Sequence, residues 1–574
     1  MFNDFLHEVS PTAANGSPSL QANCCIPAAG QADASELGTK TNPWRLALRP
    51  WLLLLIMALL GSRASVAAPR RLHFDVVVYG ATPSGIVASV AASRQGLHVA
   101  LVEPTQHIGG MVAGGLSYTD RGNVATIGGI PREFFSQVGE KYGDPVVWGF
   151  EPHVADEVFH QMLQDAKVDV FLGMQLREHN GVTKKGTRIV SITMENGTTF
   201  SGTEFADAGY EGDLMAQAGV SAAWGRESRA QYGESLAGVL PTERLDLQFR
   251  VKISPYGPHG KLLPLVSSLP RGEYGAGDKR IPSYNYRLCL TSDKADQIPY
   301  PKPPDYDPQR FALLARYLPA LEKSIGRPLN IHDVLLLEKL KNNKWDANNQ
   351  GAISTDYIGM NWTYPTASYK EREKIALEHK LYDEAFFYFL AHDPQVPPAL
   401  QAEVNQYGLA KDEFRDTDNW PHQLYIREAR RMLGQYVFTQ HDVLESGKQA
   451  DSIGMGSYQL DSHNIQRVPT EDGAVENEGD YYVVTKPYEI PYRSLTPKAS
   501  EVVNLLVPVC ISSTHAAYGT IRQEPVYMIL GQATGTALAI AVQKNVAVQD
   551  VPVSELQSRL LANHAVLHWS LPSN

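Results

Sequence analysis

A short β-branched run followed at once by a glycine turn constrains this chain most. Phe74–Tyr79 (FDVVVY) has the pattern of a fully buried parallel strand. The next six residues, GATPSG, keep the first and last glycines of a G-x-G-x-x-G turn, with Thr82 at the middle position. Gly80 permits the tight turn and Gly85 lets the following helix pack close to the strand. The amides at the N-terminus of that helix suit a pyrophosphate.

The residues after this turn strengthen the prediction of a dinucleotide site. A second strand, Val99–Val102, ends at Glu103, which is 23 residues after Gly80. That spacing places a carboxylate where the hydroxyls of an adenosine ribose would lie. Gly109 and Gly110 allow a further close approach of the backbone to a cofactor, which a site for NAD alone would not need. The stretch resembles the FAD-binding start of flavoproteins of the glutathione-reductase-like type. A strand, turn and helix without a ligand is the alternative.

Two later segments are predicted to return to the cofactor. The segment 188–206 has the pattern of a β-hairpin with Asn196-Gly197 at its turn, and its second strand leads to Asp207, near the cofactor. Near the end, the apolar run 504–511 is followed by a loop and by a helix that opens at Pro525. The N-terminus of that helix would face the pyrimidine edge of a flavin. Purely structural turns are the alternative for both segments.

The middle of the chain has a different character. Residues 226–345 are rich in Pro and Gly with short strands, and residues 367–446 have helical patterns that include 421–437. Arg427, Arg430 and Arg431 are predicted to form a solvated or ion-paired helix face, with an anion site as the alternative. We therefore predict an α/β fold: a glutathione-reductase-like FAD-binding Rossmann domain with an inserted mixed α+β middle domain. The predicted boundaries are 72–225 and 486–574 for the FAD-binding domain and 226–485 for the middle domain.

The first 68 residues have the composition of a disordered leader and a signal peptide. Arg45 and Arg49 precede the apolar run Trp51–Leu60, and small residues end at Ala68. An uncleaved anchor is the alternative, but the run is short for a membrane span. We therefore expect a periplasmic or secreted protein with no stable membrane span after cleavage.

Composition narrows the classes of partner and cofactor. The net charge of −11 argues against nucleic acid as a partner. Beyond the leader only Cys289 and Cys510 remain, too few for a disulfide framework or a four-cysteine iron–sulfur cluster, so buried free thiols are expected. No metal site is predicted.

Several stretches together carry a resemblance to a family. They include GATPSGIVASVAASRQG with EPTQHIGGM, then DAGYEGDLMAQAGV, DNWPHQLYIREARRMLGQYV and VPVCISSTHAAYGTIRQEPVYMILGQATGTAL. The chain resembles bacterial FAD-dependent oxidoreductases of the xanthan-lyase-like type, which are distantly related to the flavoprotein subunit of heterodisulfide reductase. The resemblance implies that FAD is bound at Gly80, Thr82, Gly85, Glu103, Gly109, Gly110, Asp207, Gly519, Arg522 and Glu524.

Two histidines are the candidate catalytic residues. His515 lies just before the helix that should face the flavin, and His463 follows Asp461 at a spacing that would let the carboxylate orient the ring. A structural role is the alternative for both. Arg287, Arg493 and Arg522 could hold an anionic substrate or pair with carboxylates. The aromatic side chains of the middle region are expected to pack in its core, with stacking on a sugar or other ring as the alternative; they are Trp345, Trp362, Tyr364, Tyr369 and Trp420.

The predicted function follows from these features. We expect an exported FAD-dependent dehydrogenase or oxidase that transfers a hydride from a small metabolite, such as one derived from a carbohydrate, to the flavin. Its electron acceptor would be oxygen, a quinone or a redox protein. The alternatives are a flavin-binding module without turnover and, with less support, a polysaccharide lyase.

Overall fold

The computed structural model describes residues 70–241, 245–445 and 447–569. The predicted leader and signal peptide lie outside the described residues. The predicted first strand is β1 (Arg71–Tyr79), which pairs in parallel with β2 (Val99–Val102) on one side and with β6 (Thr199–Asp207) on the other. In register, Tyr79 lies opposite Val102 and Asp207, so all three strands end at the same edge.

Further strands complete a seven-stranded mixed sheet of order β3-β2-β1-β6-β5-β4, with β20 also paired to β6. β3 (Asp169–Phe171) and β20 (Leu505–Leu506) are parallel to their neighbours. β5 (Arg188–Thr193) forms an antiparallel hairpin with β6 and pairs with β4 (Val182–Lys185). The predicted hairpin and the return of the C-terminal segment to the first sheet are both confirmed.

Two helices from opposite ends of the chain pack closely beside this sheet. They are α2 (Pro83–Ser93) and α13 (Glu524–Lys544). A Cβ added at Gly531 would lie 2.3 Å from the carbonyl oxygen of Ser84, and one at Gly535 would lie 2.1 Å from that of Ala88. Small residues of the two helices are therefore in direct contact. α13 is long and apolar enough to cross a membrane, but it is buried inside this fold.

The other helices of this part are α3 (Gly110–Ala113), α4 (Gly129–Lys141), α5 (Pro152–Ala166), α6 (Asp213–Gln217), α12 (His515–Ile521) and α14 (Val553–Ala562). α12 packs against β15 (Leu460–Ser462), which pairs with β18 (Tyr481–Val483). Cys289 and Cys510 are buried free thiols, as predicted.

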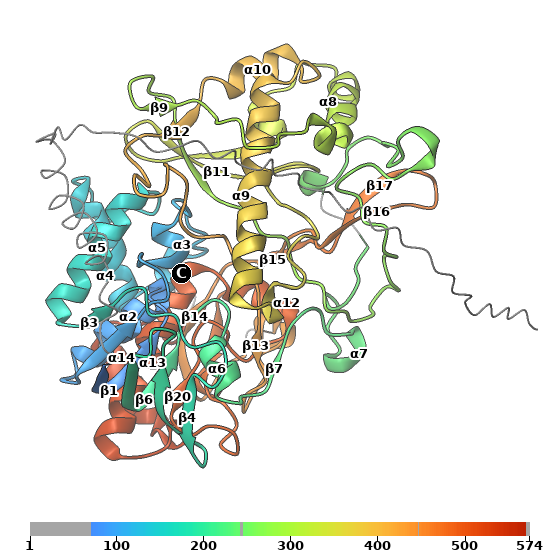
Figure 1. The fold of residues 1–574 in the computed structure, drawn as a ribbon. Coiled ribbons are helices and arrows are strands. Elements are labelled where there is room, and N and C mark those ends of the chain that lie inside the picture. Colours follow the sequence, from blue (N-terminus) through green and yellow to red (C-terminus); the bar gives the residue numbers. More distant parts are fainter. Residues whose placement is uncertain (1–69, 242–244, 446, 570–574) are drawn as a thin grey trace, which may run out of the picture. The chain divides into compact units, whose positions relative to one another are not determined.

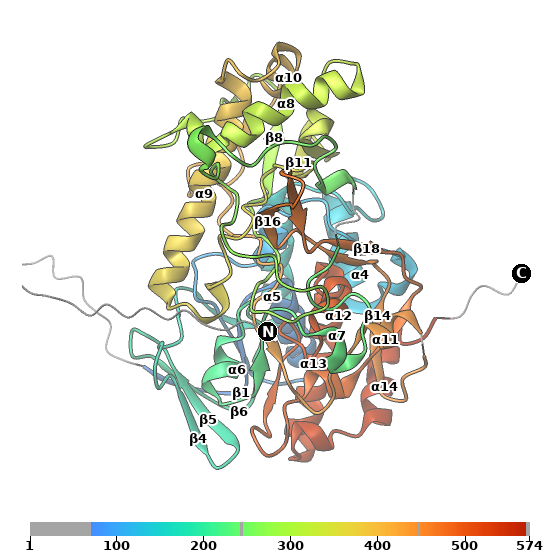
Figure 2. The same cartoon turned by 90° about the vertical axis from the view of Figure 1, so that its right-hand side faces the viewer.

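The described residues of the middle region, 226–485, add no strand to the seven-stranded sheet. It holds a second, antiparallel sheet of order β10-β11-β8-β12-β9, whose strands are Leu335–Lys339, Lys344–Asn349, Leu288–Thr291, Gly408–Ala410 and Gln297–Ile298. Its helices are α7 (Arg229–Tyr232), α8 (Ala312–Ile325), α9 (Tyr369–His392), α10 (Pro398–Val404) and α11 (Gln440–Leu444). Figures 1 and 2 show α9 running from the neighbourhood of α10 toward α6 of the Rossmann part.

Short two-stranded ladders join the remaining segments. β7 (Ala222–Ala223) pairs with β13 (Arg431–Met432), β14 (Ser452–Gly456) with β19 (Tyr488–Pro491), and β16 (Gln466–Pro469) with β17 (Val475–Glu478). The last pair forms a hairpin whose turn is exposed while most of its strand residues are buried.

One predicted element is wrong. Residues 421–437 do not form a helix; within them only β13 is regular. Arg427 and Arg431 are fully buried rather than solvated, and each pairs with a carboxylate, so only the ion-pairing part of that prediction is confirmed. Arg427 lies 2.9 Å from Asp356, and Arg431 lies 2.6 Å from Glu227. Buried charges persist only when paired in this way.

Candidate active site

The glycine turn after β1 leaves no room for side chains. A Cβ at Gly85 would lie 1.9 Å from the carbonyl oxygen of Gly80, and one at Gly80, where φ is +97°, would lie 2.7 Å from the amide nitrogen of Gly209. Thr82 caps α2: its hydroxyl accepts from the amide of Gly85 at 3.3 Å and donates to the carbonyl of Ala208 at 2.8 Å. Thr82 therefore ties the turn to the end of β6, a role the middle glycine of the motif could not fill.

Glu103 holds the loop that follows β2. Its carboxylate accepts from the amide of Ala81 at 2.7 Å and from the amide and hydroxyl of Thr105 at 2.8 and 2.7 Å. Burial raises the pKa of Glu103. The glycine pair lies beyond this loop with φ values of +81° at Gly109 and +47° at Gly110. A Cβ at Gly110 would lie 2.3 Å from the hydroxyl of Tyr210, so only glycine fits there.

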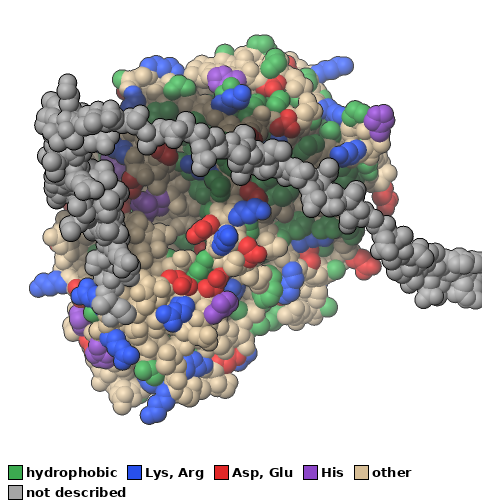
Figure 3. Space-filling view, viewed as in Figure 1, with side chains coloured by type: hydrophobic (Ala, Val, Ile, Leu, Met, Phe, Trp, Pro, Cys, Tyr) green, Lys and Arg blue, Asp and Glu red, His purple; other side chains and the backbone are tan. Residues whose placement is uncertain are grey.

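A cavity of about 380 Å³ opens beside these residues. From the predicted cofactor residues, Gly80, Thr82, Glu103 and Gly110 line it. The opposite wall comes from the middle region and includes Tyr286, Tyr364, Tyr369, Arg372, Glu373, His422 and Gln423. Two of the aromatic side chains expected in the core, Tyr364 and Tyr369, thus line this cavity. Figure 3 shows a face on which charged side chains of both signs are interspersed and which is hollowed between α5 and α9.

The remaining predicted cofactor residues lie outside the cavity lining. The buried carboxylate of Asp207 accepts from the amides of Gly209 and Met215 at 3.2 and 2.7 Å, and burial raises its pKa to about 7. Glu524 accepts from the hydroxyl of Tyr210 at 2.7 Å, and burial raises its pKa to about 8. Because Tyr210 lines the cavity, Glu524 at the start of α13 is one side chain removed from it.

α12 and β15 meet through a glycine and an ion pair. A Cβ at Gly519 would lie 2.7 Å from the carbonyl oxygen of Asp461, which explains the glycine. Arg522 donates to the Asp461 carboxylate at 2.6 Å. Arg287 likewise pairs with Asp346 at 2.8 Å, and Arg493 pairs with Asp451. All three candidate substrate-binding arginines are thus paired with carboxylates.

His463 lies between two carboxylates. Its Nδ1 is 2.9 Å from Asp356, and its Nε2 is 3.6 Å from Asp461. The nearer partner, Asp356, belongs to a loop about a hundred residues earlier and was not predicted. Asp461 also binds Arg522, so His463 is connected through one carboxylate to the C-cap residue of α12.

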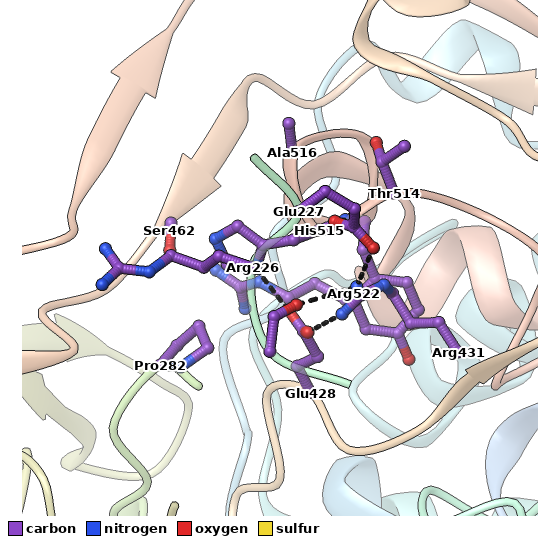
Figure 4. Close-up of polar contacts among 12 residues, drawn as sticks. Arg226, Glu227, Pro282, Glu428, Arg431, Ser462, Thr514, His515, Ala516 and Arg522 are labelled. Atoms are coloured by element: carbon purple, nitrogen blue, oxygen red, sulfur yellow. Dashed lines mark hydrogen bonds and ion pairs between the residues drawn. The ribbon is translucent and has the colours of Figure 1, made fainter. Parts of the chain in front are cut away.

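His515 has one partnered and one free ring nitrogen. Its Nδ1 is 2.7 Å from Glu428, and its backbone amide donates to Glu227 at 2.9 Å. Its Nε2 is buried and has no hydrogen-bond partner within the described part of the chain. Figure 4 shows Glu428 between Arg431 and His515. Burial, with Arg431 nearby, lowers the pKa of His515 well below its usual value. The contact with Glu428 favours the tautomer with its proton on Nδ1, which leaves the lone pair on Nε2.

One cluster of side chains that could bind a metal ion already contains a positively charged side chain. Glu151, His153 and Glu413 lie close enough together to bind a metal ion. The ammonium group of Lys344 lies 2.7 Å from both glutamates, so a lysine supplies the positive charge there.

Comparisons with known proteins agree with this architecture. The family model for FAD dependent oxidoreductases matches residues 75–560. The chain belongs to the FAD-dependent oxidoreductase family. A search of curated proteins finds no match to this oxidoreductase.

Many solved structures resemble parts of the oxidoreductase. A geranylgeranyl bacteriochlorophyll reductase-like protein from Thermoplasma acidophilum is 12 % identical, with 86 % of this chain and 85 % of that chain covered and a TM-score of 0.35. THI4 from Thermovibrio ammonificans is 19 % identical, with 33 % of this chain and 76 % of that chain covered and a TM-score of 0.21. A mutant flavin monooxygenase from Stenotrophomonas maltophilia is 17 % identical, with 24 % of this chain and 38 % of that chain covered and a TM-score of 0.19. The match therefore spans less than half of that protein.

FAD is the cofactor of this oxidoreductase, and the cradle fits it. The glycines at 80, 85 and 110 stand where any Cβ would collide with backbone or with Tyr210. Ser84 at the start of α2 has a buried hydroxyl without a hydrogen-bond partner among the described residues, as do Tyr369 and one ring nitrogen of His422 in the facing wall. A bound dinucleotide supplies the polar atoms that such groups require.

Sequence reasoning missed the partners of both histidines. In the sequence Glu428 stands among the three arginines of the predicted helix face, and no pattern singles out Asp356. The run REARR carries a signal, because three arginines and one glutamate within five residues of a buried segment must pair with one another or with distant charges.

Proposed function

We propose that this FAD-dependent oxidoreductase oxidises a hydroxyl-bearing carbon of a small metabolite, such as one derived from a carbohydrate. The observation that carries the proposal is the pairing of His515 with Glu428, which leaves Nε2 free. A neutral imidazole with one nitrogen oriented by a carboxylate and the other open is the arrangement of a general base.

The proposed reaction assigns a separate role to FAD and to each of several side chains of this protein. FAD, when bound, supplies the acceptor for a hydride from the substrate carbon. His515 takes the hydroxyl proton at Nε2 as the carbonyl forms, and Glu428 stabilises the resulting imidazolium across Nδ1. The ion pair with Arg431 compensates the charge of the Glu428 carboxylate in its buried position. His463, between Asp356 and Asp461, is a second polar group that we assign to holding the substrate.

We propose in addition that the protein is exported. The apolar run Trp51–Leu60 with its basic flank supports secretion into the periplasm or beyond, where NAD(P)H is not supplied. Electrons would then pass to oxygen, a quinone or a redox protein. We also propose that the chain is related to the xanthan-lyase-like flavoproteins and, more distantly, to the flavoprotein subunit of heterodisulfide reductase. The proposed domain boundaries lie at residues 225 and 485.

An anaerobic spectroscopic titration tests this function. The purified chain, loaded with FAD, is mixed with a panel of sugars, sugar acids and other hydroxylated metabolites, and with NADPH. We expect at least one metabolite to bleach the visible flavin absorption quickly and NADPH to do so slowly. Rapid bleaching by NADPH alone would contradict the proposal. Bound flavin that no compound reduces would favour a module without turnover.

A further inference from the structure

We propose that the middle region forms half of the binding site for the adenosine diphosphate end of FAD, through Tyr369 and His422. Neither side chain belongs to a dinucleotide-binding motif. The inference concerns cofactor binding, so it does not depend on the proposed reaction.

The cavity corresponds to the adenosine end of the site. Glu103 follows β2 at the position that contacts the adenosine ribose in folds of this kind, and the start of α2 is where the pyrophosphate lies. Both line the cavity, through Glu103 and through Gly80 and Thr82. The facing wall, supplied by the start of α9 and by residues 422–424, must therefore contact the adenosine, its ribose or the phosphates.

Tyr369 presents a free hydroxyl at this wall. It is the first residue of α9, and its hydroxyl is buried without a hydrogen-bond partner within the described ranges. The position of the residue is fixed: Ser368 caps the helix in a reciprocal pair with Glu371, and the amide of Tyr369 donates to Glu178 at 2.8 Å. A fixed phenol with an unsatisfied hydroxyl is suited to a ring nitrogen or a ribose hydroxyl.

His422 presents a free ring nitrogen at the same wall. Its ring stacks on His107 with centroids 4.1 Å apart, and Nε2 of His107 is 2.8 Å from Asp416. Burial, with His107 nearby, lowers the pKa of His422 to about 4, so the ring is neutral at pH 7. Its buried Nε2 lacks a hydrogen-bond partner in the described chain. A neutral imidazole there can donate to a phosphate oxygen or bind a ribose hydroxyl.

The wall is fastened to the Rossmann part by an arginine. Arg372, one helical turn after Tyr369, makes two hydrogen bonds to Asp213 at 2.7 and 3.0 Å, and its Nε donates to the carbonyl of Tyr364 at 3.1 Å. Asp213 begins α6, directly after the turn at Gly209 that lies against Gly80. The pair therefore holds the start of α9 against the glycine cradle.

Binding measurements on the full chain, after removal of flavin, test the proposal. FAD, ADP and riboflavin are titrated separately into wild type, Tyr369→Phe, His422→Ala and the control Tyr388→Phe. Tyr388 lies on the same helix, packs edge-on against Tyr306 and does not line the cavity. We expect Tyr369→Phe to weaken FAD and ADP about fivefold, as for one lost hydrogen bond, and His422→Ala to weaken them about tenfold. Riboflavin affinity should not change, and Tyr388→Phe should bind all three like wild type.

Unchanged FAD and ADP affinity in Tyr369→Phe and His422→Ala would overturn the proposal, and so would an equal loss for riboflavin and ADP. If His422→Ala does not fold, as judged by circular dichroism, Tyr369→Phe decides alone. No substrate enters these titrations, so failure of the proposed reaction would leave their result unaffected.

Discussion

Glu428 lies 2.7 Å from the Nδ1 atom of His515, although 87 residues separate the two in the chain. The other carboxylate oxygen pairs with Arg431, which in turn pairs with Glu227. All four side chains are buried. This chain of charges fixes the imidazole, and of its two nitrogens only the buried Nε2 has no hydrogen-bond partner among the described residues, which leaves it available as a general base.

The first prediction concerns Glu428. Glu428→Gln keeps the shape but removes the charge that stabilises a protonated His515, so substrate-driven bleaching should slow by roughly 10²-fold or more. Stopped-flow absorbance under anaerobic conditions measures this rate. Glu413→Gln is the matched control, because that buried carboxylate serves Lys344 and not His515. A bleaching rate equal to wild type would remove Glu428 from the mechanism.

A second prediction uses two glycines with positive φ. Gly110→Ala should lower FAD occupancy strongly, because its Cβ would lie 2.3 Å from the hydroxyl of Tyr210. Gly96→Ala is the control: its φ is +87°, but no atom lies within 4 Å of the added Cβ. The ratio of flavin to protein absorbance reports the occupancy. Equal occupancy in both variants would mean that the space at Gly110 is not needed for the cofactor.

The third prediction tests the contact of α2 with α13. Gly535→Ala would place a Cβ 2.1 Å from the carbonyl of Ala88, so the free energy of unfolding should fall by about 1 to 3 kcal/mol. Gly447→Ala is the matched control, because its φ, like that of Gly535, lies outside the left-handed region and no atom lies within 4 Å of the added Cβ. Denaturant titrations measure both. A stability of Gly535→Ala equal to or above that of the control would show that the helices are further apart than the structure places them.

The fourth prediction concerns pH. Burial raises the pKa of Glu204 to about 8, although Arg188 lies 3.2 Å away. In the unfolded chain this group ionises near its ordinary pKa of about 4.3. Between these two pKa values the folded state holds a proton that the unfolded chain has released. The free energy of unfolding therefore falls as the pH rises from about 4 to 8.

Glu204→Gln should flatten this part of the pH profile of stability, since each pKa unit is worth about 1.4 kcal/mol. Urea midpoints at pH 5, 6.5 and 8 measure the effect. An identical pH dependence in wild type and variant would show that Glu204 is ionised in the folded chain.

Much of the fold could be predicted from the sequence because it rests on local patterns. The strand and turn at 74–85, the hairpin at 188–206 and the helix that opens at Pro525 each carry their own signal, and the structure confirms them. Residues 421–437 could not be predicted in the same way. Whether Arg427 is solvated or buried depends on Asp356, which is distant in the sequence, so composition alone favoured a charged helix.

In the candidate site, too, residues identified by local patterns could be predicted, whereas contacts made only by the tertiary fold could not. The glycines and Glu103 could be predicted because turn geometry and spacing identify them. His515 was singled out by its position before α13, but its partner Glu428 could not be, because only the tertiary fold brings the two together. For His463 the sequence favoured Asp461 as the orienting carboxylate, whereas Asp356 is nearer.

Single-turnover reduction of the His515→Ala variant tests the central claim most directly. The flavin-loaded variant and wild type are mixed anaerobically with a substrate that bleaches wild type, and reoxidation by oxygen is recorded separately. We predict that reduction slows by about 10² to 10⁴-fold while FAD content and reoxidation stay as in wild type. Reduction of the variant at the wild-type rate would contradict the assignment of His515 as the base.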